Sequence, residues 1–261
     1  MPKKLKVAMV APPWLKIPPD GYGAIEYILE YLAQELPKLG VEVVLFTIGE
    51  TTLKGVKKRY FYEHEQYEHI HKALYDAINI PVTQSLFALN AIKKAGDFDI
   101  IHDHTFHLGG STMAHLDPRA FPPVLCTLHG AFSTDETIKQ GLPDNRPMFS
   151  QMATAERLYF AGISNAQLSH APAALKKRLV GVVHNAIKVG EFAFSDKKQD
   201  YFITLARFNR DKGQALAAKL CDELGYNLKM AALVAGITTP RKLLLELTNP
   251  ISPYRHFADF K

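Results

Sequence analysis

The sequence predicts an α/β protein in which helices cover both faces of a mostly parallel sheet. Apolar, strand-like runs alternate with helical segments along roughly the first 190 residues, and this alternation is typical of parallel sheets. The chain has 261 residues, of which 47% are hydrophobic and 22% charged, as expected of a folded protein with a sizeable core.

The first elements follow one another in a regular order. Residues 5–12 read as a buried strand, and residues 41–49 read as the second strand. Between them, apolar residues spaced three and four apart predict a helix that Pro37 and Gly40 close. These apolar residues are Ile25, Ile28, Leu29, Leu32 and Leu36.

The later elements continue the alternation. Residues 63–95 are expected to be largely helical, with an interruption at Pro81. Further strands are expected at 98–104, 122–130, 158–164 and 179–187, with a loop at 141–147 and a helix near 150–157.

The two cysteines and the lengths of the apolar runs indicate the cellular compartment. Cys126 and Cys221 lie in apolar runs, which indicates buried thiols in a reducing compartment. The first apolar run is short and ends at Pro12, which suits a strand better than a signal peptide, and no run is long enough to span a bilayer. We therefore expect a cytoplasmic protein.

The net charge of +5 comes with scattered basic clusters, at Lys3 to Lys6, Lys54 to Arg59 and Lys176 to Arg178. Such clusters are typical of solvated surface, and they would also attract sugar nucleotides or make peripheral contact with a membrane. No zinc-finger or RNA-binding signature accompanies them, so no nucleic-acid partner is expected.

Polar motifs stand at the carboxyl ends of the expected strands, where function gathers in sheets of this kind. They are residues 21–26, 102–107, 128–130, 163–165 and 184–187. The first, GYGAIE, has Glu26 in place of the third glycine of a dinucleotide fingerprint, which argues against an NAD site. It could serve as a close backbone approach to an anion at a helix N-terminus, or simply as a flexible turn.

The histidines of the third strand are open to two interpretations. His102 and His104 alternate in strand register and so share one side of the sheet, as metal ligands would need, and His107 follows them. A metal-dependent hydrolase would use His102, His104 and His129. Histidines at strand ends also serve as hydrogen-bonding or substrate contacts, and that interpretation needs no metal.

Six segments taken in order resemble family 4 glycosyltransferases, which have the GT-B fold of two Rossmann-like domains facing across a cleft. The segments are residues 21–49, 98–106, 124–132, 160–167, 182–187 and 201–231. The resemblance implies an enzyme of carbohydrate metabolism that transfers a sugar from a nucleotide-diphospho-sugar to an acceptor hydroxyl. It implies retention at the anomeric carbon, with no cofactor and no metal required.

The resemblance also implies roles for single residues. Gly23 matches the glycine whose backbone approaches the donor diphosphate and the acceptor, and His129 matches the T-x-H-G histidine beside the transferred sugar, the catalytic candidate. Arg207 and Lys212 match the basic pair of the G-R-x4-K-G loop that neutralises the diphosphate, although Ala206 stands where the family has glycine.

Four further residues are candidates for lining the cleft or contacting the acceptor. They are Tyr22, His104, Ser164 and Asn185. For Ser164 and Asn185 a supporting structural role is favoured over direct chemistry.

The division into domains departs from the family after residue 233. We expect an acceptor-side Rossmann-like domain at 1–195, the strand–helix–strand start of a donor-binding domain at 196–234, and an atypical tail at 235–261. The family's Glu-x7-Glu element is absent after Glu223. A unit this small buries too little surface to be stable alone, so it is expected to lean on the first domain or on another chain.

Two hypotheses follow from this truncated donor domain. The first is a sugar transferase with weak or no activity as a single chain. The second is a regulatory, non-catalytic remnant that forms an oligomer or pairs with another polypeptide.

Overall fold

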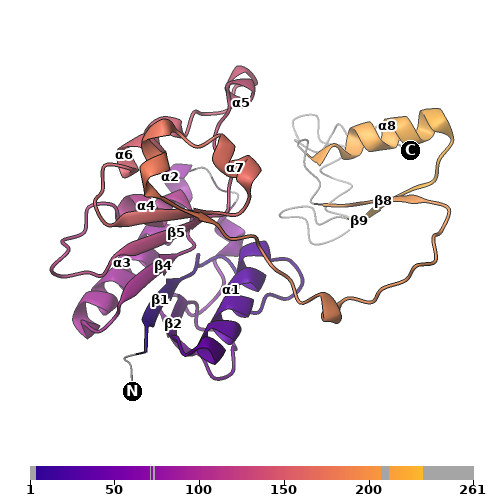
Figure 1. The fold of residues 1–261 in the computed structure, drawn as a ribbon. Coiled ribbons are helices and arrows are strands. Elements are labelled where there is room, and N and C mark those ends of the chain that lie inside the picture. Colours follow the sequence, from indigo (N-terminus) through magenta and orange to yellow (C-terminus); the bar gives the residue numbers. More distant parts are fainter. Residues whose placement is uncertain (1–3, 71, 73, 207–211, 232–261) are drawn as a thin grey trace. The chain divides into compact units, whose positions relative to one another are not determined.

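The chain divides into two units, Met1–Ile187 and Lys188–Lys261, and the structure describes residues 4–70, 72, 74–206 and 212–231. In the computed structural model the first unit is built on a seven-stranded sheet (Figure 1). All its neighbouring strands are parallel, in the order β3-β2-β1-β4-β5-β6-β7. The strands are β1 (Lys6–Val10), β2 (Glu42–Thr47), β3 (Lys57–Tyr60), β4 (Ile100–Asp103), β5 (Val124–Leu128), β6 (Leu158–Gly162) and β7 (Leu179–Val182). The predicted α/β class is confirmed.

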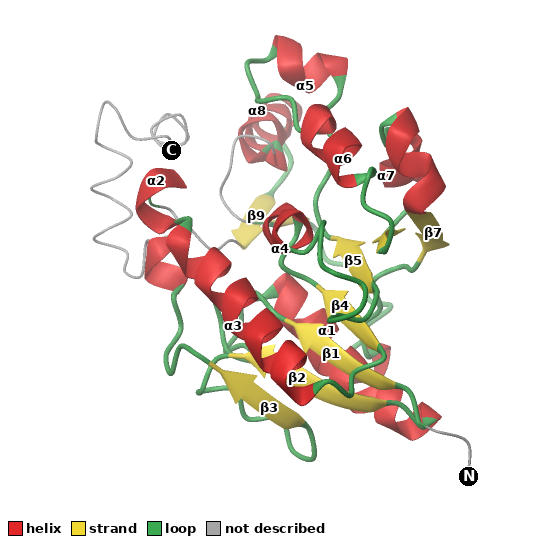
Figure 2. Ribbon diagram, turned by 90° about the vertical axis from the view of Figure 1, so that its left-hand side faces the viewer, coloured by secondary structure: helices red, strands yellow, loops and turns green. Residues whose placement is uncertain are grey.

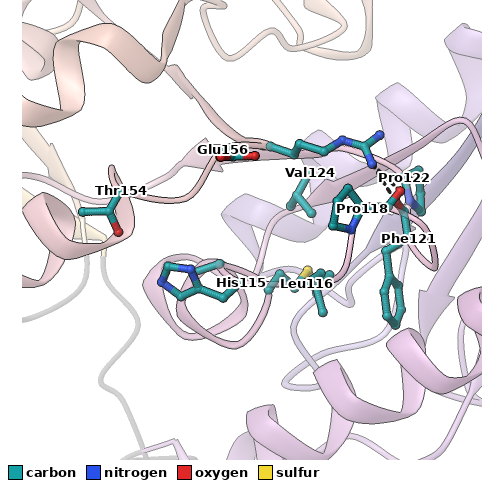
Figure 3. A pocket seen from close by; sticks show the side chains of 11 residues that line it. His115, Leu116, Pro118, Phe121, Pro122, Val124, Thr154 and Glu156 are labelled. Carbon is teal, nitrogen blue, oxygen red and sulfur yellow. Dashed lines mark hydrogen bonds between the residues drawn. The ribbon is translucent and has the colours of Figure 1, made fainter.

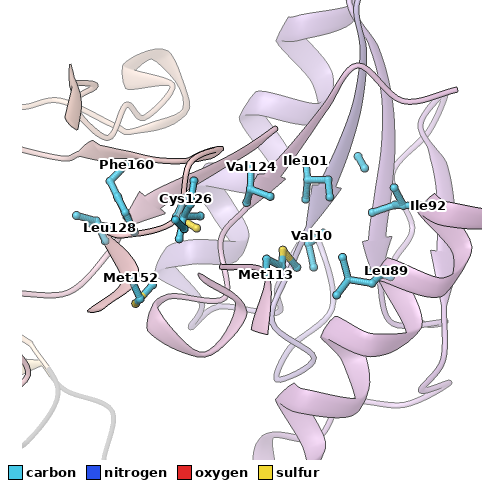
Figure 4. Close-up of a cluster of buried hydrophobic side chains, with 14 of the residues drawn as sticks. Val10, Leu89, Ile92, Ile101, Met113, Val124, Cys126, Leu128, Met152 and Phe160 are labelled. Atoms are coloured by element: carbon cyan, nitrogen blue, oxygen red, sulfur yellow. The ribbon is translucent and has the colours of Figure 1, made fainter. Parts of the chain in front are cut away.

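Helices lie on both faces of this sheet (Figure 2). They are α1 (Ala24–Glu35), α2 (Leu74–Ala77), α3 (Asn79–Ala95), α4 (His107–Thr112), α5 (Asp135–Lys139), α6 (Arg146–Met152) and α7 (Asn165–Ser169), with 3-10 turns at Leu36–Leu39, Tyr67–His69, Ala173–Arg178 and Val189–Glu191. One buried cluster joins α1 to the sheet through Leu29, Met9 and Leu45. A larger cluster on the other face includes Ile92 of α3 and Met152 of α6 (Figure 4).

The alternation of side chains along each strand explains why the two clusters separate. Val7 and Met9 of β1 belong to the cluster on the α1 side, whereas Ala8 and Val10 belong to the cluster on the α3 side. Successive side chains of a strand point to opposite faces, so a strand buried on both faces must be apolar throughout. The five residues KVAMV meet this requirement except at Lys6, where the strand begins.

The end of the first helix was predicted from its sequence signals. The α-helix ends at Glu35 and continues as a 3-10 turn that contains Pro37. Gly40 follows in the left-handed region with φ of 83°, and its N–H donates to the carbonyls of Leu36 and Pro37. Glycine adopts this conformation at little cost, which is why it ends helices so often.

Two local predictions were wrong, and one strand was not expected. The basic segment lies on the surface as predicted, and it overlaps the edge strand β3, whose four residues, KKRY, are all exposed. Pro81 does not interrupt the helical region: it is the third residue of α3, where a missing N–H costs no helical hydrogen bond. The helix expected near 150–157 is α6, which begins at Arg146 and ends at Met152.

The second unit contains a smaller β–α–β element. β8 (Phe202–Leu205) and β9 (Leu228–Ala231) pair in parallel, and α8 (Gln214–Leu224) connects them. This is the strand–helix–strand order predicted for residues 196–234, while the domain limits at 195 and 234 remain predictions. Among the described helices, none is long and apolar enough to cross a bilayer.

Candidate functional site

The strand order reverses between β1 and β4. β2 and β3 extend the sheet on one side of β1, while β4 to β7 extend it on the other. In open parallel sheets such a reversal leaves a crevice at the carboxyl ends of the two central strands, and ligands bind there. The loop that leads to Gly23 follows β1, and the histidines of residues 102–107 lie at the end of β4. The candidate site therefore lies at this edge.

Three histidines from β4 and β5 lie in contact at this edge. The rings of His102 and His104 have centroids 4.1 Å apart, and those of His104 and His129 are stacked at 5.2 Å. His104 Nδ1 and His129 Nε2 are joined by a hydrogen bond of 2.9 Å, and His102 Nε2 is 2.8 Å from the Thr127 hydroxyl. We call these three residues the histidine cluster.

The register of the sheet brings the cluster together. His102 pairs with Leu125 of β5, so Thr127 and His129, two and four residues further on, share the face of His102 and His104. His102 also pairs with Met9, which places the cluster on the α1 face. The strand register thus determines which side chains can meet.

Burial keeps the cluster uncharged at neutral pH. It lowers the pKa of His102 and of His129 to about 4, and the pKa of His104 well below its usual range. For His102 and His104 the neighbouring histidines lower the pKa further, because a second positive charge nearby disfavours the first. A neutral imidazole both donates and accepts a hydrogen bond, so His129 can bind a hydroxyl group.

A buried carboxyl group on the opposite face fixes the turn after β4. The backbone N–H and the hydroxyl of Thr105 donate to Asp103 Oδ1, at 3.2 and 2.7 Å, and the thiol of Cys126 lies 3.5 Å from Oδ2. Asp103 is fully buried, and burial raises its pKa to about 6. Gly109 of α4 packs directly against these groups. The network holds the segment that carries His104.

Gln167 is a positioning residue that the sequence analysis missed. Its amide nitrogen donates to the carbonyls of Leu128 and Gly130, at 2.7 and 2.6 Å, and its amide oxygen accepts from the N–H of Ile163. It therefore ties the ends of β5 and β6 together on both sides of His129. The spacing Ser164-x-x-Gln167 is that of a capping box and could have indicated it.

Ser164 and Asn185 lie apart from the cluster's hydrogen bonds. Ser164 is the N-cap of α7, and its hydroxyl accepts from the N–H of Gln167 at 3.0 Å. This contact agrees with the structural role favoured for it. Asn185 is exposed beyond the end of β7, and within the described part of the chain no hydrogen bond joins it to the histidines.

The Gly23 loop enters α1 in a conformation that only glycine adopts easily. Gly23 is the N-cap of α1 with φ of 154°, and a Cβ placed there would lie 2.7 Å from the Cβ of Pro19. Tyr22 beside it is exposed, with its ring 6.2 Å from that of Tyr67. An open cavity of about 280 Å³ adjoins the loop, lined by Leu15, Lys16, Asp20, Tyr22, Glu50 and Glu65.

Glu26, in the first turn of α1, is a buried acid beside the Gly23 loop. Its pKa is raised to about 7, chiefly by burial and to a smaller extent by Glu65, against the opposing effect of its own backbone N–H. The folded state therefore favours the protonated carboxyl group. Its contribution to stability is complete below pH 4.5 and is lost as the pH rises through 7.

We predict that Glu26→Gln abolishes this pH dependence. Between pH 4.5 and 8, the free energy of unfolding of the wild type should fall relative to that of the variant by about 2–3 kcal/mol. Urea denaturation of both proteins at each pH measures this difference. Groups other than residue 26 titrate alike in both proteins, so their contribution to the free energy of unfolding cancels. Glu30→Gln on the same helix controls for the loss of a charge. A difference that does not change with pH contradicts the prediction.

The basic pair belongs to the second unit. Arg207 lies outside the described residues. Lys212 is exposed, directly before Gly213, the N-cap of α8 with φ of 71°. The structure thus places this lysine at a helix N-terminus, and its role toward the diphosphate remains a prediction.

A second cavity, of about 310 Å³, lies at the amino ends of β5 and β6, the opposite edge from His129 (Figure 3). Arg157 Nη1 donates to the carbonyls of Pro118 and Phe121 at its rim, at 2.7 and 3.0 Å. This arginine holds a loop in place, and we assign no function to the cavity.

The hypothesis of a metal site finds no support in the geometry of the cluster. Three of its ring nitrogens are engaged in the hydrogen bonds to Thr127 and between His104 and His129. In the part of the chain that the structure describes, no group of three or more His, Cys, Asp or Glu residues is arranged to hold a metal ion.

Comparison with known families gives a match over half of the chain. The sequence model of a family described as Glycosyltransferase Family 4 matches residues 25–162, from the first turn of α1 to the end of β6. The match includes the histidine cluster, Asp103 and Glu26. No curated protein sequence matches the chain.

The chain is also similar to solved structures. AviGT4, a glycosyltransferase involved in avilamycin A biosynthesis, is 19% identical to this chain, with a TM-score of 0.49. The match covers 87% of this chain and 56% of the length of AviGT4, so this chain spans a little more than half of that protein. The Arabidopsis thaliana protein UGT89C1, complexed with UDP-L-rhamnose, is 13% identical with a TM-score of 0.50, over 90% of this chain and 66% of that one.

A Listeria monocytogenes protein assigned as a UDP-N-acetylglucosamine 2-epimerase gives a TM-score of 0.53 at 12% identity, over 99% of this chain and 72% of that one. UGT89C1 and a protein assigned as an epimerase are thus both similar in fold to this chain. The fold alone does not decide the reaction.

Proposed function

Because the chain belongs to glycosyltransferase family 4, we propose that it transfers a sugar from a nucleotide-diphospho-sugar to an acceptor hydroxyl with retention at the anomeric carbon. The observation that carries the proposal is the position of neutral His129 at the edge where the strand order reverses, within the matched region. In this reaction the bond from the anomeric carbon to the diphosphate breaks, a bond to the acceptor oxygen forms, and the proton of the acceptor hydroxyl passes to an oxygen of the departing diphosphate.

The departing diphosphate gains negative charge in the transition state. Fixed cations stabilise this negative charge more strongly in the transition state than in the ground state. Such a difference lowers the activation free energy and so accelerates the reaction. We assign this role to Arg207 and Lys212. Lys212 precedes the N-terminus of α8, whose partial positive charge favours an anion as well.

His129 has a different role in the proposal. Its low pKa means that it carries no charge at neutral pH, so it does not act as a cation toward the diphosphate. It instead makes a hydrogen bond to a hydroxyl group of the transferred sugar. Such a bond orients the anomeric carbon toward the acceptor.

The cavity beside Tyr22 is the proposed entrance for the acceptor. Asp20, Glu50 and Glu65 line it together with Lys16, so carboxylates outnumber the single lysine. A negative lining repels phosphate groups. We therefore propose an uncharged or amine-bearing acceptor whose hydroxyl groups bind the carboxylates and whose apolar face packs on Tyr22.

Calorimetry with a panel of nucleotide sugars tests the proposal, combined with detection of the transfer product. UDP-sugars come first, since the Arabidopsis protein of similar fold is complexed with one. We expect at least one donor to bind, and Arg207→Ala to weaken that binding about tenfold or more. Lys219→Ala, which removes an exposed cation from α8, is the matched control. Binding of no nucleotide sugar, or equal binding by Arg207→Ala, contradicts the proposal.

A further inference from the structure

His104 is completely buried at the centre of the sheet, and the proposed reaction gives it no part. Its backbone N–H donates to the carbonyl of Val10 at 2.9 Å, which continues the pairing of β4 with β1. Its ring lies against His102 on one side and His129 on the other. Inside a core, a side chain of this polarity costs free energy unless its nitrogens are bonded.

Only one of the two ring nitrogens of His104 is bonded within the described residues. Nδ1 makes the 2.9 Å hydrogen bond to His129 Nε2, whereas Nε2 is buried and has no partner there. A leucine would fill a similar space without leaving a nitrogen unpaired. The bond to His129 is therefore the feature that distinguishes His104 from a residue that only fills the core.

The bond couples the protonation of the two rings. Both imidazoles are neutral, so a single proton lies between Nδ1 of His104 and Nε2 of His129. If His104 donates it, His129 carries its own proton on Nδ1; if His129 donates it, Nδ1 of His129 is an acceptor. In either arrangement the tautomer of one ring fixes that of the other.

The surroundings also fix the orientation of His104. Its ring has no exposed surface and lies against the tilted ring of His102, which is itself bonded to the Thr127 hydroxyl at 2.8 Å. A rotated ring would present a carbon atom to His129 Nε2 and lose the bond. Because Nε2 of His129 is engaged in the bond to His104, Nδ1 is the ring nitrogen of His129 that remains for a ligand.

We propose that His104 is a positioning residue that holds the His129 imidazole in one orientation and one neutral tautomer, so that Nδ1 of His129 has a defined hydrogen-bonding role toward the ligand. The part of this inference that concerns the ligand rests on the proposed function. The part that concerns the tautomer does not.

Two variants of His104, whose new side chains are nearly equal in size and shape, test the proposal. In His104→Asn, an amide oxygen or nitrogen takes the place of Nδ1, next to Cγ, and can bond His129 with either polarity. In His104→Leu, a methyl group takes that place and no bond is available. If His104 only fills the core, leucine is the better replacement; if it positions His129, asparagine is.

Nuclear magnetic resonance of the chain labelled with ¹⁵N-histidine reads the tautomer of His129 directly. We expect a single neutral tautomer in the wild type and a mixture of both in His104→Leu. His102→Leu removes the ring that lies against His104 but no hydrogen bond to His129, and should leave the single tautomer. A mixture in the wild type overturns the proposal, as does a single tautomer in His104→Leu or a mixture in His102→Leu. The wild-type measurement decides even if a variant does not fold.

Kinetics with the donor found by calorimetry complete the test. His104→Leu should lower kcat roughly tenfold with a smaller change in KM, and His104→Asn should restore most of the loss. Equal kcat values for the two variants overturn the role toward the ligand. If the wild type transfers no sugar, the proposed function fails while the tautomer measurement still stands.

Discussion

Replacement of His129 by alanine is expected to lower kcat for sugar transfer roughly 10²- to 10³-fold, as does the loss of a preorganised hydrogen-bond donor in other active sites. His129 is only half-buried, and no hydrogen bond of its Nδ1 is found among the described residues, so its imidazole edge can reach a ligand. Because the proposed bond orients the anomeric carbon toward the acceptor, the loss should appear in kcat more than in donor affinity.

Steady-state kinetics and calorimetry on the same preparation check this result. His115→Ala is the matched control, since His115 lines the cavity at the amino ends of β5 and β6, away from the cluster. We expect the control to keep wild-type kcat. A His129→Ala variant with kcat within about threefold of the wild type would remove His129 from the catalytic role.

Replacement of Gly109 by alanine is expected to destabilise the first unit by about 3 kcal/mol. An added Cβ would overlap the Thr105 hydroxyl and Asp103 Oδ1. These two atoms share a buried hydrogen bond of 2.7 Å, so neither can move without breaking it. The variant must either displace α4 or leave the buried carboxyl group without its donor, and both are costly.

Urea denaturation measures the free energy of unfolding of this variant. Gly49→Ala is a control at the end of β2, where the added Cβ would meet only the side chain of Glu63, which is exposed and can turn away. The control should change stability by no more than about 0.5 kcal/mol. A loss below about 1 kcal/mol for Gly109→Ala would contradict the prediction, because it would mean that Thr105 and Asp103 can shift to accommodate the added Cβ at little cost.

The elements that sequence reasoning found are those whose patterns are local. β1 and β2 were predicted because strands buried on both faces are apolar throughout, and α1 because its apolar residues recur at helical spacing. β3 was missed because an exposed edge strand, with the sequence KKRY, carries no hydrophobic pattern. Charged side chains on an edge strand also oppose pairing with other chains, which explains why such a sequence is tolerated there.

The candidate site was predicted in part. His129 was chosen from a resemblance, and the strand period by itself placed His102 and His104 on one face. Ser164 was given a structural role, and its capping hydrogen bond to the N–H of Gln167 agrees with that prediction. Gln167 was missed because its partners, Leu128 at the end of β5 and Gly130 just beyond it, lie nearly forty residues earlier in the chain.

The sequence by itself determined the α/β class, the succession of the main strands along the chain, and that His102 and His104 share one side of the sheet. These properties follow from backbone geometry, which repeats every two residues in a strand and every 3.6 in a helix. Only the tertiary structure decided that His104 bonds His129, that Asp103 is buried among donors and that the strand order reverses between β1 and β4. Those contacts join residues distant in the chain, and their register is set by how the sheet packs against its helices.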